Sequence, residues 1–331
     1  MSSWPGRPEP HDVAVPAPLV LGADCGGTTS RIVVATLDGR VVGRASGGPG
    51  NPVAGPPAET AAALGRAVRA ALADVDPARV VAATVGLAGV ARLAEPAAAA
   101  PYAAQWSATG LRCPMWTVGD AVVAFAAGTP EPSGSVLIAG TGAVAARIRD
   151  GGTVQVADGL GWLLGDEGSG YWLGLRAARL TARALARDAP AGPLVRAVCT
   201  RVGATDPDGF VTRVYDLGRH RLAGLADTVT EAAGAGDPQA VALVAEAADR
   251  LTDTLAEVHP APGPVVLAGG VLTGAVEIRA AVQRRLLARL GRPGLVAGDG
   301  AAAAAWLAAR ELRPGPSGAG VALHTRLIAG T

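Results

Sequence analysis

The chain has 331 residues, 50% of them hydrophobic and 17% charged, with a formal net charge of +1. That length allows two domains with cores of their own, and the balanced charge argues against nucleic-acid and membrane partners. No apolar stretch runs for the roughly 18–20 residues of a membrane-spanning helix, so we expect no membrane partner of that kind.

The sequence contains no lysine, so all 29 basic residues are arginine. A P-loop, a protein-kinase-type lysine and a Schiff-base catalyst are therefore excluded. Any ATP must be bound by glycine turns, hydroxyl groups, helix N-termini and Mg²⁺. Three cysteines, Cys25, Cys113 and Cys199, are far apart without CxxC spacing, which indicates neither a disulfide framework nor zinc. This usage fits a cytoplasmic protein.

The first elements in chain order form a glycine-rich hairpin. After a proline-rich stretch, 1–18, which we predict to be a disordered tail, an apolar strand at 19–23 ends in Asp24. A turn follows, and a second apolar strand covers 32–37. Exposed N–H groups of such a turn can bind a phosphate, and Asp24 can hold Mg²⁺; an ordinary hairpin is the alternative. The turn residues are Gly26, Gly27, Thr28 and Thr29.

A third strand, 40–46, completes this meander, and helices and strands then alternate. A glycine- and proline-framed loop presents Asn51, which is either a partner of a sugar hydroxyl or a turn asparagine. Residues 130–132 (Pro-Glu-Pro) are the natural end of a first domain, 19–131. The intervening elements are a helix at 58–75, a strand at 79–86, a helix at 91–109, a strand at 115–118 and a helix at 121–127.

Asp120 stands between the last of these strands and its helix. The carboxyl ends of strands in open α/β sheets line the ligand crevice, so a carboxylate there can accept the proton of an attacking hydroxyl. An aspartate at a helix start is also a common N-cap. Position alone leaves both interpretations open.

The strand–turn–strand pattern then repeats. A strand at 135–139 turns through Gly140, Thr141 and Gly142, returns from Ala143 to Ile148, and continues into a strand at 153–157. Two meanders with the same turn chemistry predict an internal duplication. Two such hairpins facing each other could grip a polyphosphate from both sides.

The segment from 158 to 174 is unusually aromatic for a chain with 3% aromatic residues. Carboxylates beside flat apolar faces suit a sugar, whereas acids at the start of the predicted helix 169–187 also serve as capping groups. We favour a sugar site. Its predicted residues are Gly159, Leu160, Gly161, Trp162, Asp166 and Glu167.

We predict a second domain over 132–312, which includes the second meander, and a tail over 313–331. Helical segments fill 192–258, and a strand at 264–268 leads through Gly269 and Gly270 into a helix at 273–290 that begins with Thr273. Such a strand–glycine–helix junction suits a nucleoside or phosphate. A short strand at 294–297 and an alanine-rich helix from Asp299 complete it. The repeated βββαβαβα order predicts an α/β protein of two domains with an interdomain cleft.

These motifs together resemble the N-acetylglucosamine kinase/glucosamine kinase group of the BadF/BadG/BcrA/BcrD ATPase family, which has the actin-like ATPase fold. The resemblance rests on DCGGTTSR, GGPGNP, GLAG, Gly119-Asp120, AGTGAV, GWLLGDEGSGYWLG and AGGV, in this order. It implies that Asp120 is the base for the sugar 6-hydroxyl. It further implies sugar contacts by Asn51, Gly159 to Gly161 and Asp166, and nucleotide contacts by Thr28, Thr141, Gly142 and Gly270. Leu160 stands where some relatives carry tryptophan.

We therefore expect an ATP- and Mg²⁺-dependent kinase for the 6-hydroxyl of glucosamine, with N-acetylglucosamine as the alternative substrate. The preference rests on Asp166 and Glu167, which could pair with a free 2-ammonium group. A dehydratase-activator-type ATPase with an iron–sulfur cluster and a non-catalytic sugar sensor are more distant alternatives. The cysteine-rich loop of zinc-containing repressor/kinases is absent from the sequence, and a homodimer remains open.

Overall fold

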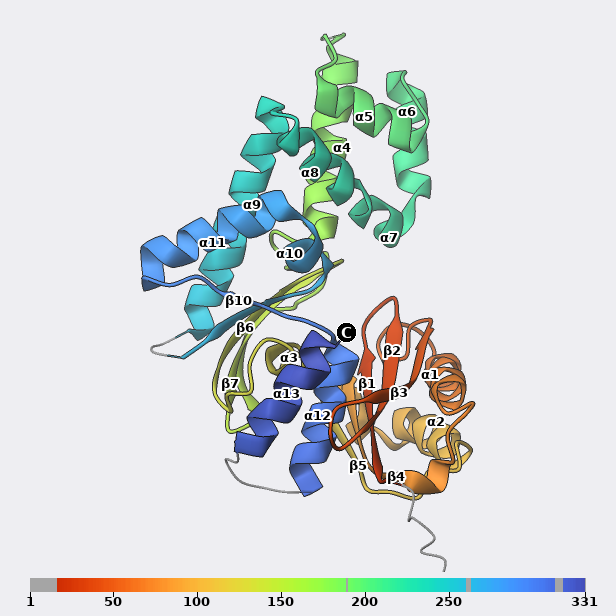
Figure 1. Ribbon diagram of the computed structural model, residues 1–331. Helices are drawn as coiled ribbons and strands as arrows, with labels where there is room; N and C mark the ends of the chain where they lie inside the picture. The colour runs from red at the N-terminus through yellow and green to blue at the C-terminus, as the bar shows by residue number, and fades with distance from the viewer. Residues whose placement is uncertain (1–16, 189, 260–262, 313–317, 331) are drawn as a thin grey trace, which may run out of the picture.

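The computed structural model describes residues 17–188, 190–259, 263–312 and 318–330, so most of the predicted N-terminal tail lies outside the described residues. Two five-stranded sheets organise the chain (Figure 1). The first has the order β3-β2-β1-β4-β5, with β1–β2–β3 antiparallel and β1, β4 and β5 parallel. Its strands are β1 (Leu19–Cys25), β2 (Ser30–Thr36), β3 (Val41–Gly47), β4 (Val80–Leu87) and β5 (Met115–Gly119).

The second sheet repeats this arrangement in the order β10-β9-β6-β7-β8, with β6–β7–β8 antiparallel and β6, β9 and β10 parallel. Each strand therefore has a counterpart at the same place in the other sheet, which confirms the predicted duplication and the α/β class. The strands are β6 (Gly134–Ala139), β7 (Ala143–Arg149), β8 (Gly152–Asp158), β9 (Val265–Ala268) and β10 (Leu295–Val296).

The register of the first sheet brings its predicted site residues to one edge. Asp24 pairs with Gly86, which pairs in turn with Val118, so the carboxyl ends of β1, β4 and β5 are level. Asp120 follows directly as the first residue of α3 (Asp120–Ala126). Asp24 and Asp120 therefore lie at the edge where open α/β sheets bind ligands.

Helices from distant parts of the chain cover the first sheet. Its outer face packs on α1 (Pro57–Ala71), with α2 (Pro96–Ser107) beside α1 and two 3₁₀ turns, η1 (Pro77–Arg79) and η2 (Val90–Ala94), in the connections. Between the two sheets lie α3, α12 (Gly300–Leu312) and α13 (Gly318–Ala329) (Figure 1). The backbone of α12 approaches β1 so closely that a Cβ on Gly22 would lie 2.1 Å from the Ala305 nitrogen.

The outer side of the second sheet carries a large helical layer with its own apolar core. Asp206 and Asp237 cap the helices that follow them, and Gly203 ends another with a positive φ. These residues divide the predicted helical region into separate helices. The layer comprises α4 (Gly170–Ala186), α5 (Pro193–Val202), α6 (Pro207–Asp216), α7 (Gly218–Ala223), α8 (Leu225–Gly234), α9 (Pro238–Val258), α10 (Gly270–Gly274) and α11 (Val276–Leu290).

The C-terminal segment differs from the sequence expectation. Instead of a featureless tail, residues 318–329 form α13, which buries Leu323, His324 and Leu327 against the core between the sheets. His324 Nε2 lies 2.7 Å from the carbonyl oxygen of Ala126, at the end of α3. The predicted domain limits stay a prediction, although α12, from the second predicted domain, packs on the first sheet. None of the described helices meets the length and hydropathy needed to cross a membrane.

Candidate active site

Three aspartates gather at the carboxyl edge of the first sheet. Burial, together with the negative charges of Asp120 and Asp299, raises the pKa of Asp24 to about 6, against the opposing effect of Arg31. Burial also raises the pKa of Asp120, whose Oδ1 accepts a hydrogen bond of 3.0 Å from the Ala121 N–H. A carboxylate with a raised pKa is a stronger base, and neighbouring carboxylates attract cations.

Asp299 was not among the predicted site residues. Its carboxylate caps α12 by accepting hydrogen bonds from the N–H groups of Ala301 (2.8 Å) and Ala302 (3.2 Å), and it forms an ion pair with Arg44 of β3. The following residue must be glycine, because a Cβ on Gly300 would lie 2.4 Å from Oδ2 of Asp24. The acid before an alanine-rich helix was the only sequence signal, and it indicated just a helix start.

The glycine turn of the first hairpin is open. The Gly26 N–H donates to the Thr29 carbonyl at 2.9 Å, and Gly27, Thr28 and Thr29 are exposed. A Cβ on Gly27 would meet no atom within 4 Å. Packing inside the protein therefore does not require glycine at position 27. Glycine there instead allows an external group to approach the backbone closely.

The second hairpin is fixed to α4 and to the loop after β9. The N–H groups of Gly170 and Tyr171 donate to the carbonyls of Gly140 (2.8 Å) and Thr141 (3.2 Å). Gly269 has a φ of 83°, and a Cβ there would lie 2.4 Å from the Ala139 oxygen. These contacts bring Gly140, at the start of the turn, beside Gly270. That Thr141, Gly142 and Ala143 bind phosphate there stays a prediction. Thr273 is exposed, and its hydroxyl donates to the Gly269 carbonyl at 3.0 Å.

The loop from 158 to 167 is organised by Asp158, for which the sequence had indicated no role. Its carboxylate accepts the N–H groups of Asp166 (2.7 Å) and Glu167 (2.8 Å), and its φ of 59° starts the turn. The Gly159 N–H donates to the Ala143 carbonyl at 3.0 Å, and Gly161 has a φ of 83°. Leu160 and Trp162 project outward, and the Trp162 ring packs edge-on against Tyr171.

Both acids of the predicted sugar motif already have cationic partners. Asp166 is buried; its Oδ1 accepts the Ala143 N–H at 3.0 Å, and its Oδ2 lies 3.4 Å from Arg219. Glu167 is more exposed and lies 3.6 Å from Arg250. Burial raises the pKa of Asp166, while the Ala143 N–H and Arg219 oppose this rise. Asp166 thus ties the second hairpin to α7.

Asn51 is 1% exposed, and only one of its two side-chain polar atoms has a hydrogen-bond partner among the described residues. Its Oδ1 accepts the Val53 N–H at 3.0 Å, whereas its Nδ2 has no hydrogen-bond partner among the described residues. The Tyr102 hydroxyl fixes the loop by donating to the Gly50 carbonyl at 2.9 Å. A buried amide N–H₂ without an acceptor costs about 1–3 kcal/mol, so this donor suits a ligand oxygen.

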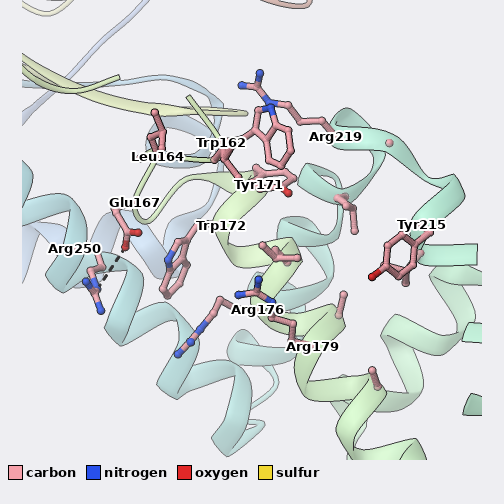
Figure 2. A pocket seen from close by; sticks show the side chains of 18 of the residues that line it. Trp162, Leu164, Glu167, Tyr171, Trp172, Arg176, Arg179, Tyr215, Arg219 and Arg250 are labelled. Atoms are coloured by element: carbon pink, nitrogen blue, oxygen red, sulfur yellow. Dashed lines mark ion pairs between the residues drawn. The ribbon is translucent and has the colours of Figure 1, made fainter. Parts of the chain in front are cut away.

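The predicted residues thus fall into two groups. Asp24, Asp120, Asn51 and the first hairpin belong to the first sheet, whereas the second hairpin, the 158–167 loop and Gly269 to Thr273 belong to the second. Within the described part of the chain, no hydrogen bond or ion pair joins the two groups. A cavity of about 1020 Å³ opens beside the loop and is lined by Trp162, Glu167 and Arg219, among others (Figure 2). Asp24 and Asp120 do not line it.

Comparison with known proteins identifies the family of this chain. The sequence profile of the BadF/BadG/BcrA/BcrD ATPase family matches residues 21–289. The chain belongs to this family. An N-acetyl-D-glucosamine kinase of Dictyostelium discoideum is 29% identical over 162 residues, which cover 46% of this chain and 51%, about half, of that protein. An N-acetylmuramic acid/N-acetylglucosamine kinase of Clostridium acetobutylicum is 24% identical over 236 residues, or 70% and 76% of the two chains.

Solved structures share the fold of this chain. A structural-genomics protein from Chromobacterium violaceum, provisionally designated an N-acetylglucosamine kinase, has a TM-score of 0.72 and 26% identity over 88% of this chain and 99% of its own. A ROK family glucokinase from Streptomyces griseus has a TM-score of 0.54 and 21% identity over 95% and 100%. The fold of this family member is therefore that of the actin-like sugar kinases, as predicted.

The residues of this family member fit ATP and Mg²⁺. The open turn at Gly27 and the unpartnered Nδ2 of Asn51 leave room and donors for ligand oxygens. Although three aspartates lie at this edge, no three or more His, Cys, Asp or Glu side chains of the described residues are arranged so that they could hold a metal ion together. Mg²⁺ uses one or two carboxylates and takes its other ligands from water and phosphates. Asp24 would hold the ion, with Asp120 and Asp299 adding negative charge.

Proposed function

We propose that this protein is an ATP-dependent hexosamine kinase that phosphorylates the 6-hydroxyl of N-acetylglucosamine. The observation that carries the proposal is the half-buried carboxylate of Asp120 at the first residue of α3, on the same sheet edge as Asp24 and the open glycine turn. The names of the two curated relatives and membership of the ATPase family support the choice of reaction.

In the proposed reaction, Asp120 accepts the proton of the sugar 6-hydroxyl. The 6-oxygen forms a bond to the γ-phosphorus of ATP, the bond from that phosphorus to the β–γ bridging oxygen breaks, and ADP leaves. The Ala121 N–H holds Oδ1 of Asp120, so Oδ2 is the oxygen left for the hydroxyl. Asn51 would orient the sugar through Nδ2, the donor that lacks a protein partner.

Phosphate binding is assigned to the two hairpins and to the loop after β9. Thr28, Thr29 and the N–H groups of the first turn would hold one side of the triphosphate; Thr141, Gly142 and Gly270 would hold the other. When bound, Mg²⁺ neutralises charge on the β- and γ-phosphates. Because no hydrogen bond or ion pair of the described residues joins the two residue groups, ATP and sugar themselves would link them.

Two ion pairs decide our choice between the two amino sugars. The expectation of glucosamine required an acid free to pair with its 2-ammonium group. Asp166 is instead paired with Arg219 and the Ala143 N–H, and Glu167 with Arg250. Glucosamine would have to displace an arginine, whereas the neutral acetamido group would not. This removes the reason for preferring glucosamine, which becomes the competing substrate.

The test is a coupled ADP-release assay over N-acetylglucosamine, glucosamine, glucose and mannose. We expect the highest kcat/KM with N-acetylglucosamine. Asp120→Asn keeps the position and size of the side chain but removes the base, so kcat should fall by roughly 10²–10⁴-fold while ATP affinity persists. A wild-type protein that releases no ADP with any of the four sugars would refute the kinase proposal. Turnover of Asp120→Asn within about threefold of wild type would refute the assignment of Asp120 as the base.

The alternatives weighed from the sequence fit the structure less well. An iron–sulfur cluster shared between two subunits needs accessible thiolates. Of the two cysteines considered for it, Cys199 is buried in the core of the helical layer, and the half-buried Cys113 packs against the separate core of the first sheet. A sugar sensor does not require a carboxylate such as that of Asp120 at the sheet edge. The ADP-release assay also separates the sensor from the kinase, since a sensor would bind sugar without turnover.

A further inference from the structure

The loop after β3 crosses the edge of the first sheet at which the predicted site residues gather. Strand pairing sets one residue of each strand in a row along this edge, at Gly47, Ser30, Cys25, Leu87 and Gly119. A Cβ on Gly50 would collide with the Ser30 hydroxyl. A Cβ on Gly89, just after β4, would lie 2.7 Å from a methyl group of Val53. The loop therefore runs over the row from β3 to β4, and Val53 packs beside the strand that leads to Asp120.

Val53 is the exposed apolar side chain of this loop. Residues 50–52 are buried, whereas Val53 is 54% exposed. Its backbone is fixed, because the Val53 N–H donates to Oδ1 of Asn51 at 3.0 Å and the Ala54 N–H donates to the Asn51 carbonyl at 3.3 Å. Within residues 17–131, all of which the structure describes, the only other exposed large apolar side chain is Met115, at the opposite edge of the sheet. A tight turn thus presents one apolar group beside the proposed sugar donor, Asn51.

The two segments that meet at Val53 carry no charge. Residues 45–58, which include the loop, contain no ionisable side chain, and neither do residues 80–91, which include β4 and Gly89. An ammonium group placed against these segments would lose water without gaining a carboxylate partner from them. A methyl group would instead be removed from water by the valine side chain, which is favourable. The surface at Val53 therefore suits a neutral, apolar substituent of a ligand.

A hexosamine has apolar groups of two kinds, the C–H bonds on the faces of its ring and the methyl group of an N-acetyl substituent. The broad ring face suits a flat aromatic side chain such as that of Trp162, which is 48% exposed in the loop of the second sheet. The branched side chain of Val53 is too small to cover a ring, but it matches a methyl group in size. The acetyl methyl is therefore the better partner for Val53.

Building on the proposed kinase function, on which this assignment rests, we propose that Val53 contacts the methyl group of the 2-acetamido substituent and selects N-acetylated hexosamines over free amino sugars. Asn51 would orient the sugar through Nδ2, while the neighbouring valine contacts the substituent on C2. The ion pairs of Asp166 and Glu167 remove a reason for binding glucosamine. Val53 adds a favourable contact that only the N-acetylated sugar can make.

The first test compares kcat/KM for N-acetylglucosamine, glucosamine and glucose. Val53→Ala should lower the value for N-acetylglucosamine about tenfold, the lower limit for one missing methylene in an apolar pocket, and should change the other two by less than about twofold. Val53→Asp offers a carboxylate to the 2-ammonium group, so the ratio of glucosamine to N-acetylglucosamine should rise at least about 100-fold. Val241→Ala is the matched control, because this valine of α9 is 48% exposed and lies outside the site. It should leave all three values unchanged.

The second test does not depend on turnover. With ¹³C-labelled valine methyl groups, the NMR signals of Val53 are those lost in Val53→Ala, and we expect a nuclear Overhauser effect between them and the acetyl methyl of bound N-acetylglucosamine. Absence of this effect would overturn the proposal.

An equal fall in kcat/KM for all three sugars in Val53→Ala would also overturn it, because the valine would then act on every hexose through the placement of Asn51. Circular dichroism and an unchanged KM for ATP check that each variant is folded. A wild type that shows the nuclear Overhauser effect but releases no ADP would refute the kinase proposal and leave the contact of Val53 with the acetyl group intact.

Discussion

Asp24 should make the protein less stable than a neutral residue would. Its pKa in the folded chain, about 6, lies above the ordinary value of 3.8, because the carboxylate is buried near Asp120 and Asp299. A raised pKa means that the folded state holds its proton more tightly than the unfolded state. The contribution of Asp24 to the free energy of unfolding is therefore fully present below pH 3.8, and it is lost as the pH rises through about 6.

The magnitude follows from the two pKa values. Relative to a neutral side chain, the ionised Asp24 should cost about 3 kcal/mol at pH 7.5 but only about 1 kcal/mol at pH 4.5. Asp24→Asn should therefore raise the free energy of unfolding by about these amounts, measured by urea denaturation in EDTA without nucleotide. The same variant should lose kinase activity, since the proposed ligand of Mg²⁺ is gone.

The control is Asp74→Asn, because Asp74 is exposed at the surface. It should change the free energy of unfolding by less than about 0.5 kcal/mol at either pH. If Asp24→Asn raised the free energy of unfolding equally at pH 4.5 and pH 7.5, the increase would not come from removing the charge of Asp24. A loss of stability at pH 7.5 would refute the reasoning altogether.

Three further changes separate the parts of the site. Gly27→Val should leave the melting temperature unchanged, because a Cβ there meets no atom within 4 Å, and should weaken ATP binding far more than sugar binding; equal losses in separate titrations would contradict this. Tyr102→Phe removes the hydrogen bond to the Gly50 carbonyl, which is worth about 0.5–1.5 kcal/mol. The KM for sugar should therefore rise by roughly 2–12-fold, while the KM for ATP stays unchanged. A rise in the KM for ATP alone would count against a role of Tyr102 in placing Asn51. Asp299→Ala removes the cap of α12 and should lower the free energy of unfolding by about 0.5–2 kcal/mol. An unchanged free energy of unfolding in a denaturant titration would show that the cap is dispensable.

The strands and most helices were predictable because their signals are local. The first hairpin, the third strand and the second meander follow from apolar runs broken by glycine turns, and the structure places all six strands within a few residues of the prediction. Helix α13 was missed because its pattern is short: Leu323 and Leu327 face a core that forms only when both sheets are present.

The site was less predictable where distant residues decide its chemistry. The acids of the 158–167 loop were visible in the sequence, but their partners were not, since Arg219 lies 53 residues beyond Asp166. Asp299 was missed for the same reason, because its neighbour Asp24 is at the other end of the chain. Local patterns thus indicated which residues could do chemistry, while the fold determined which charges already had partners.

The packing of α12 has a consequence for biosynthesis. The backbone of β1 at Gly22 is covered by a helix that begins at Gly300. At about 5–20 residues per second, a ribosome needs roughly 15–60 s to reach that helix after completing β1. During this time the nascent first sheet exposes one apolar face, which is a target for chaperones and a risk for aggregation. A chain that stops before α12 should therefore be insoluble, even though every strand of the first sheet has been made.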